Sequence, residues 1–230
     1  TTSTTRAVAP PLTVAPLRQA RTRVYLVDRP NAAQSVINIG WPGVDRLSPD
    51  YAPLMVMNSL LGGSFTSRLN MNLREEKGYT YGARSRFNFR RAPGPFVASA
   101  SVRTNVTDSS LVEFFKELRG VRDRVVPHGE LQRAKSYVEL ALPGSLESTS
   151  QVAASVSQLA LFALPLAELA AYARQVRSVT AADVQRVARK YLTPDQATVV
   201  VIGDLAKVRA GIEALKLGDI TVLDVKDVAR

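Results

Sequence analysis

The spacing of apolar residues changes several times along this chain, and the order of those changes restricts the fold more than any other feature. Two segments near the start, 23–28 and 34–41, alternate as strands do. A helical period follows, and then two strands at 80–89 and 94–102 are joined by a Pro-Gly turn. Beyond this hairpin the period is helical again up to a last strand at 197–204. Strands and helices do not alternate one by one, so the order predicts an α+β fold and not a doubly wound parallel sheet.

The architecture predicted from this order is an antiparallel or mixed sheet with helices packed on one face. Residues 21–230 form a single domain in this interpretation, and no internal repeat divides them. Residues 1–20, which are rich in Thr, Ala and Pro, are predicted to be a linker or a disordered arm. The most apolar stretch, 157–173, is interrupted by Gln, Pro and Glu, so we expect no membrane span there.

The first helical stretch has clear start and stop signals. Ser48 is the predicted N-cap, with proline in the first turn, and the glycine pair at 62–63 ends the helix. The residues expected on its buried face are Leu54, Met57, Leu60 and Leu61. A shorter helix then begins at a cap provided by Ser64 or Thr66 and ends at Gly78. Its expected apolar face consists of Phe65, Leu69 and Leu73.

Helices dominate the chain after the hairpin. The first is expected to bury one apolar face, made of Leu111, Phe114, Phe115, Leu118, Val121 and Val125. Four further helices are predicted at about 128–141, 147–164, 166–177 and 181–191. Thr180 is the expected N-cap of the last of these, with Asp183 in its first turn.

Composition excludes several kinds of catalytic site. The chain has no cysteine and a single histidine, His128, so it cannot supply the several His or Cys ligands of a usual zinc site. We expect His128 to be exposed or to cap the helix that begins beside it. No GxSxG elbow, GxxxxGK[ST] loop or GxGxxG fingerprint occurs. By itself the chain therefore has no complete catalytic apparatus.

The formal charge of +10 raises the question of a nucleic-acid partner. Basic and aromatic residues interleave in the run RSRFNFRRAPGPF at 84–96, as they do in grooves that hold single strands. However, Phe87 and Phe89 alternate as the residues of a half-buried strand do, and the arginines suit a cavity that receives a peptide. We therefore expect no nucleic-acid partner.

The run LREEKGYTYGA at 73–83 places an arginine and a tyrosine on either side of a glycine stop. If the chain reverses at Gly78, Arg74 at the helix end and Tyr81 at the strand start can approach one site. The guanidinium offers paired donors to a carbonyl or carboxylate, and the phenol can donate to a developing oxyanion. In the other interpretation Arg74 pairs with a glutamate or the helix end, and Tyr81 packs in the core.

A resemblance bears on this choice. The run LGGSFTSRLNMNLREEKGYTYGA at 61–83 closely resembles a stretch of the pitrilysin/insulinase family of zinc peptidases, which includes the mitochondrial processing peptidases. The likeness extends over most of 21–204. In that family an N-terminal domain carries an HxxEH zinc motif, and a later domain contributes an Arg and a Tyr to the substrate. Arg74 and Tyr81 occupy the matching positions, whereas HxxEH is absent.

The resemblance therefore implies the non-zinc half of a metalloendopeptidase, inactive on its own. Arg74 and Tyr81 would bind the peptide substrate and support the transition state. No cofactor is expected in this chain, and Zn²⁺ is expected on a partner domain or subunit that bears HxxEH. A homo- or heterodimer is one expected form of that pairing. The alternative is a structural or interaction module of the same fold without proteolysis. A periplasmic location is expected, with the cytoplasm as the alternative.

Overall fold

The computed structural model describes residues 19–224 and residue 226. In this part of the chain, six strands form one mixed sheet in the order β3-β4-β2-β5-β1-β6. The strands are β1 (Arg23–Asp28), β2 (Gln34–Pro42), β3 (Thr80–Phe87), β4 (Pro95–Arg103), β5 (Thr198–Gly203) and β6 (Asp219–Leu223). β1 runs parallel to its neighbours β5 and β6, whereas the β2–β5, β2–β4 and β3–β4 pairs are antiparallel. The predicted α+β class with a mixed sheet is confirmed.

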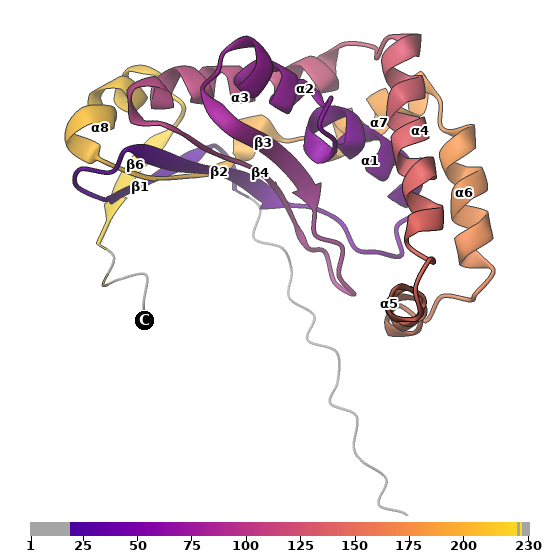
Figure 1. The fold of residues 1–230 in the computed structure, drawn as a ribbon. Helices are drawn as coiled ribbons and strands as arrows, with labels where there is room; N and C mark the ends of the chain where they lie inside the picture. Colours follow the sequence, from indigo (N-terminus) through magenta and orange to yellow (C-terminus); the bar gives the residue numbers. More distant parts are fainter. Residues whose placement is uncertain (1–18, 225, 227–230) are drawn as a thin grey trace, which may run out of the picture.

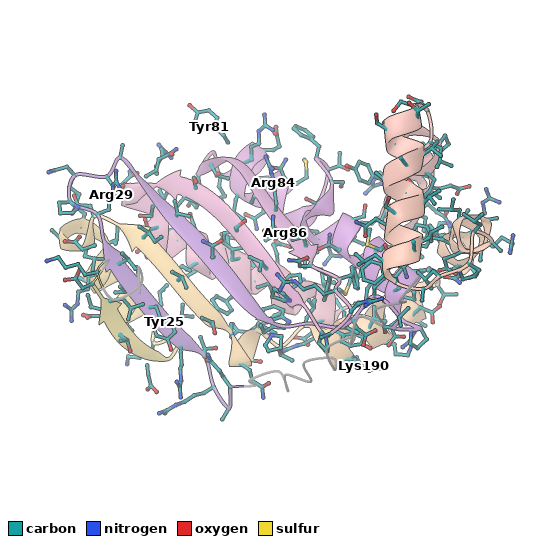
Figure 2. All side chains as sticks on the ribbon, turned by 90° about the horizontal axis from the view of Figure 1, so that it is seen from below. Tyr25, Arg29, Tyr81, Arg84, Arg86 and Lys190 are labelled. Carbon is teal, nitrogen blue, oxygen red and sulfur yellow. The ribbon has the colours of Figure 1, made fainter. Side chains whose placement is uncertain are left out.

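The helices lie on one side of the sheet and beyond one of its ends. They are α1 (Tyr51–Asn58), α2 (Arg68–Asn70), α3 (Thr107–Asp123), α4 (His128–Gly144), α5 (Thr149–Leu161), α6 (Glu168–Ser178), α7 (Ala181–Tyr191) and α8 (Leu205–Ala214). α2, α3 and α8 lie over one face of the sheet, and α4, α5 and α6 group beside its end (Figure 1). Among the described residues no helix covers the opposite face of the sheet, and this open face is the one seen in Figure 2.

Strict alternation along the central strands separates the core from the open face. On β2, Ile37 and Ile39 are buried toward the helices, and Val36 and Asn38 lie on the other face. The same alternation on β4 and β5 buries Phe96, Ala98, Ala100, Val102, Val199 and Val201. Since one face of each strand is in the core, the side chains on its other face are free to form a surface.

Most of the predicted elements are present with small shifts at their ends. The strand at 23–28 and the helix at 181–191 have the predicted bounds. Thr180 and Asp183 form a capping box, in which Thr180 Oγ1 accepts from the Asp183 amide at 3.1 Å. The buried face predicted for the first helix is confirmed.

The starts of the first two helices differ from prediction. α1 begins at Tyr51 after Asp50, because the Ser48 side chain accepts the amide of Asp50 in a turn before the helix. The second helix begins after Ser67, and neither Ser64 nor Thr66 caps it. A turn closed by the Ser67 amide and the Ser64 carbonyl comes first, at 3.2 Å.

Because of this later start, Phe65 lies outside the second helix and its side chain is exposed, whereas Leu69 and Leu73 are buried as predicted. Val125 was also wrongly assigned to a buried helical face. α3 ends at Asp123, and the chain is already extended at the next residue, Arg124. Pro127 in turn disfavours helix in Val126, so the helix does not resume before α4. Val125 is therefore exposed.

The strand at 198–203 is not the last element, contrary to prediction. α8 follows it at once and returns the chain to β6, which lies beside β1 at the edge of the sheet. α8 buries only Val208 and Ile212, so its apolar pattern is too sparse to mark a helix. Of the arm predicted at 1–20, residues 1–18 lie outside the described part. Over the residues that are described, no helix has the length and apolar content to cross a membrane.

Candidate functional site

A glycine turn joins the second helical segment to the edge strand. The helix widens into a π-helical turn at Met71–Glu76, and Gly78 then adopts a left-handed backbone with φ of 62°. The Gly78 amide donates to the Arg74 carbonyl at 3.0 Å, and the Tyr79 amide donates to the Leu73 carbonyl at 2.8 Å. The predicted glycine stop is confirmed, and it fixes the exit of the chain into β3.

Tyr81 lies at the start of β3 and is 88% exposed. The pairing of β3 with β4 shifts register between Thr80 and Ala83, and such a bulge redirects the side chains within it. Thr80 holds the irregularity, since its hydroxyl donates to the Ser101 carbonyl at 2.7 Å and accepts the Gly82 amide at 3.1 Å. Tyr81 therefore projects beyond the sheet edge with its phenol free (Figure 2).

Arg74 is held on the helical side of the turn. Its side chain is 39% exposed, and its Nε lies 3.3 Å from Glu75 Oε1. The guanidinium carbon also lies 4.7 Å from the centre of the Phe65 ring. Within the described residues, no hydrogen bond joins the side chains of Arg74 and Tyr81. The turn brings the two residues to one corner of the molecule, and their shared role stays a prediction.

A groove runs from Tyr81 across the open face of β3, β4 and β2. Its volume is about 540 Å³. The residues that line it are Gln34, Val36, Asn38, Gly62, Gly63, Thr80, Tyr81, Gly82, Arg84, Ser85, Arg86, Val97, Ser99, Ala100 and Ser101. Tyr81 is thus a lining residue and Arg74 is not. The remaining lining is mostly small and polar, as suits an extended main chain with its own donors and acceptors.

The wall of the groove above β3 depends on a glycine at the end of the first helix. A Cβ atom at Gly62 would collide with the amide nitrogen of Ser85. The Ser85 hydroxyl in turn donates to Asn58 Oδ1 at 2.9 Å. Only glycine permits this close approach of helix and strand. The glycine pair was predicted as a helix stop, and its contact with β3 was not foreseen.

The groove offers hydrogen-bonding and positive groups without a metal centre. Among the described residues, no three His, Asp or Glu side chains gather as metal ligands. His128 is exposed at the start of α4, far along the chain from the groove. The zinc expected for a peptidase of this kind therefore has no ligand set in the described residues.

Comparison with known proteins decides the family. The family model described as the peptidase M16 inactive domain matches residues 3–138, which is more than half of the chain. The chain belongs to the peptidase M16 family, as its inactive domain. The matched residues include the π-helical turn, the glycine stop and the whole of β3. The resemblance found in the sequence is confirmed.

Individual relatives of the M16 domain agree with this assignment. A zinc protease of Streptomyces coelicolor is 29% identical over 178 residues, which are 76% of this chain and 38% of the relative. The mitochondrial-processing peptidase subunit beta of Lentinula edodes is 27% identical over 199 residues, covering 81% and 41%. The crystal structure of a peptidase M16 inactive domain from Pseudomonas fluorescens matches with a TM-score of 0.73 and 28% identity, covering 83% and 46%.

The M16 domain described here therefore spans less than half the length of the curated relatives it matches. The groove and Tyr81 lie within the shared part of the chain. Sequence reasoning identified Tyr81 but missed most of the groove floor, including Asn38, Ser99 and Ser101. The available signal was their alternation with buried residues, which marks one polar face running over two strands.

Proposed function

We propose that this M16 domain is the substrate-holding half of a two-part zinc peptidase and supplies Tyr81 and Arg74 to a zinc site carried by a partner domain or subunit. The observation that carries the proposal is the position of Tyr81 in the lining of the groove, with its side chain 88% exposed. At that position the phenol hydroxyl can donate a hydrogen bond to a peptide bound in the groove.

In this proposal the two halves divide the work. The partner's zinc would act as the Lewis acid and activate the attacking water. The residues of this chain bind and orient the peptide. The Tyr81 phenol donates to the carbonyl oxygen that becomes negative as the tetrahedral intermediate forms. The Arg74 guanidinium, once turned from Glu75 toward the partner, donates its paired N–H groups to a peptide carbonyl.

Two features support this division. Tyr81 lines the groove and is largely exposed, so a partner placed beside it would face both the phenol and the peptide. The relative from Lentinula edodes is named as one subunit of a processing peptidase, which suits a domain that works with another part. Whether the zinc half lies in the same polypeptide, and in a homo- or heterodimer, depends on the complete protein. A periplasmic location is part of the proposal.

Reconstitution tests the proposal. The intact protein that contains this domain is mixed with a zinc-bearing HxxEH half, and cleavage of an internally quenched peptide is followed by fluorescence. Cleavage is expected only when both halves are present, and it should vanish when the partner's water-activating glutamate is replaced by glutamine. Equal cleavage by the zinc-bearing half alone would show that this domain has a structural role without proteolysis.

A further inference from the structure

Two arginines on β3 face the open side of the sheet, and the described part of the chain places no charged partner beside them. Ser85 and Phe87 are buried toward the helices, and Arg84 and Arg86 alternate with them on the exposed face. Figure 2 shows both along the strand that starts near Tyr81. Both line the groove, and their cross-strand neighbours on β4 are Ser99 and Val97. Neither neighbour shields or neutralises a guanidinium.

The charge of these arginines is not balanced by any of the residues that the structure describes. No ion pair of the described residues involves Arg84 or Arg86. Among the described residues, the groove lining contains no Asp or Glu. Some arginines elsewhere are paired, as Arg68 is with Glu130 at 2.7 Å and Arg186 is with Asp50 at 2.6 Å. Since both guanidinium groups stay protonated, the groove presents two positive charges to any bound chain.

The spacing of the two arginines matches an extended peptide. Residues two apart on a strand lie about 7 Å apart on one face. A substrate segment bound in the extended form has the same repeat, so its residues at alternate positions would meet the two guanidinium groups. Each guanidinium offers a fork of donors that fits a carboxylate with two hydrogen bonds. Asn38 and Ser99 on the floor can serve the main chain of that segment.

We propose that Arg84 and Arg86 select acidic substrates by binding Asp or Glu side chains at two alternate positions of the peptide. This inference rests on the proposed function, because it assumes that the groove holds substrate. Arg84 lies three positions after Tyr81, which corresponds to roughly 10 Å along a strand. The acidic pair therefore lies about three and five residues from the bond that is cleaved, on one side of it.

A nucleic acid is the other polyanion that two arginines could attract, and the aromatic residues nearby argue against it. Phe87 is buried, and the Phe89 ring packs against Tyr51 with 4.7 Å between ring centres. Neither ring is therefore free to stack on a base. Tyr81 is the exposed aromatic side chain of the groove lining, whereas single-strand binding uses several aromatic side chains on which successive bases stack. The observations favour a peptide, and an oligonucleotide becomes a competitor in the test.

The test measures kcat/KM for matched peptides with the intact protein and its zinc-bearing half. One peptide carries Glu-x-Glu starting three residues from the cleaved bond, its match carries Gln-x-Gln, and a third carries Glu-x-Glu on the other side of the bond. All end in an amide, so side-chain carboxylates are the only variable. We expect the first peptide to be cleaved about fivefold or more faster than its match at low salt, with the preference shrinking as salt rises.

The variant Arg84→Gln/Arg86→Gln should bring this preference close to one, because it should slow cleavage of the Glu-x-Glu peptide much more than cleavage of the Gln-x-Gln peptide. The control Arg29→Gln/Arg174→Gln removes the same charge from exposed residues outside the groove and should keep the preference. The inference is overturned if the Glu pair confers no preference, if both double variants act alike, or if an oligonucleotide inhibits cleavage only when Arg84 and Arg86 are present. The variant Tyr81→Phe separates this inference from the proposed function. If Tyr81→Phe still slows cleavage in any of these cases, the proposed function stands and only the acidic preference is wrong. If Tyr81→Phe cleaves as wild type does, the proposed function itself is contradicted.

Discussion

The guanidinium carbon of Arg74 lies 4.7 Å from the centre of the Phe65 ring. This contact explains why an exposed phenylalanine occupies the turn before the second helix, and it makes Phe65 a positioning residue for Arg74. The Arg74 side chain keeps a defined direction while its donors stay accessible. The turn at Gly78 then joins the helical segment that contains Arg74 to the strand that contains Tyr81.

The first prediction concerns this pair. Arg74→Ala should lower kcat/KM of the reconstituted peptidase, and Phe65→Ala should lower it by a smaller factor because Arg74 remains but is less well placed. The double variant should be no worse than Arg74→Ala, since both changes act through one side chain. Peptide cleavage assays on the four proteins provide the cycle. Additive losses would show that Phe65 acts independently of Arg74.

The stability of the Phe65 variant is the control for this cycle. Phe65→Ala is expected to cost less than about 1 kcal/mol of unfolding free energy.

The second prediction compares two glycines that bound the site. Gly78→Ala forces an alanine into the left-handed region and should cost about 1–2 kcal/mol of unfolding free energy, although a Cβ there meets no atom. Gly78→Asn should cost less, because asparagine tolerates that conformation. Gly62→Ala should cost at least about 2 kcal/mol, because its Cβ collides with the β3 backbone. Urea denaturation measures all three, and the reverse order would contradict the described turn and contact.

The third prediction concerns the pH dependence of stability. Asp50 is buried, with its side chain 7% exposed, and it accepts hydrogen bonds from Arg186, Lys190 and Tyr191 at 2.6, 3.0 and 2.7 Å. Burial alone would raise the pKa of Asp50, but these three hydrogen bonds outweigh it and lower the pKa from 3.8 to about 2. The folded state therefore favours the carboxylate, and the bonds tie the start of α1 to α7.

The sign of the effect follows from the lower pKa in the folded state. The stabilisation from Asp50 is fully present above the unfolded pKa of 3.8 and is lost as the pH falls toward 2. Asp50→Asn should therefore cost about 2 kcal/mol at pH 7, and the difference from wild type should shrink between pH 4 and pH 2. Asp195→Asn, at an exposed ion pair, should cost less than about 1 kcal/mol. Equal losses for the two variants would contradict the account of Asp50.

The sequence was sufficient to predict the parts of the site that depend on local chemistry. Glycine ends a helix in the left-handed conformation without strain, so the glycine at position 78 made the turn and the strand after it predictable. The start of the second helix was less predictable from the sequence, because three hydroxyl residues, Ser64, Thr66 and Ser67, all qualify as caps. In the structure Ser67 occupies the N-cap position, although its hydroxyl makes no capping hydrogen bond. The choice depends on where Phe65 and Leu69 pack, which one sequence does not reveal.

Features that depend on distant contacts were out of reach of the sequence. Asp50 and Arg186 are 136 residues apart, and no local pattern indicates that they meet. The floor of the groove likewise requires the pairing of β2 with β4, which sets Asn38 beside Ser99. α8 and β6 were missed because each buries few residues, so their patterns are weak. The alternation of residues along β3 predicted that this strand has an exposed face. The structure shows that Arg84 and Arg86 lie on that face and line the groove.

The most direct test of the account is the turnover of the reconstituted peptidase with Tyr81→Phe. This change removes one hydroxyl from an exposed side chain, so folding should not change. Tyr79→Phe, two residues earlier in the same turn, is the matched control. The account predicts that kcat/KM falls about 30-fold to 900-fold for Tyr81→Phe, as expected for loss of an oxyanion donor, and stays near the wild-type value for Tyr79→Phe. Turnover by Tyr81→Phe within twofold of wild type would contradict it.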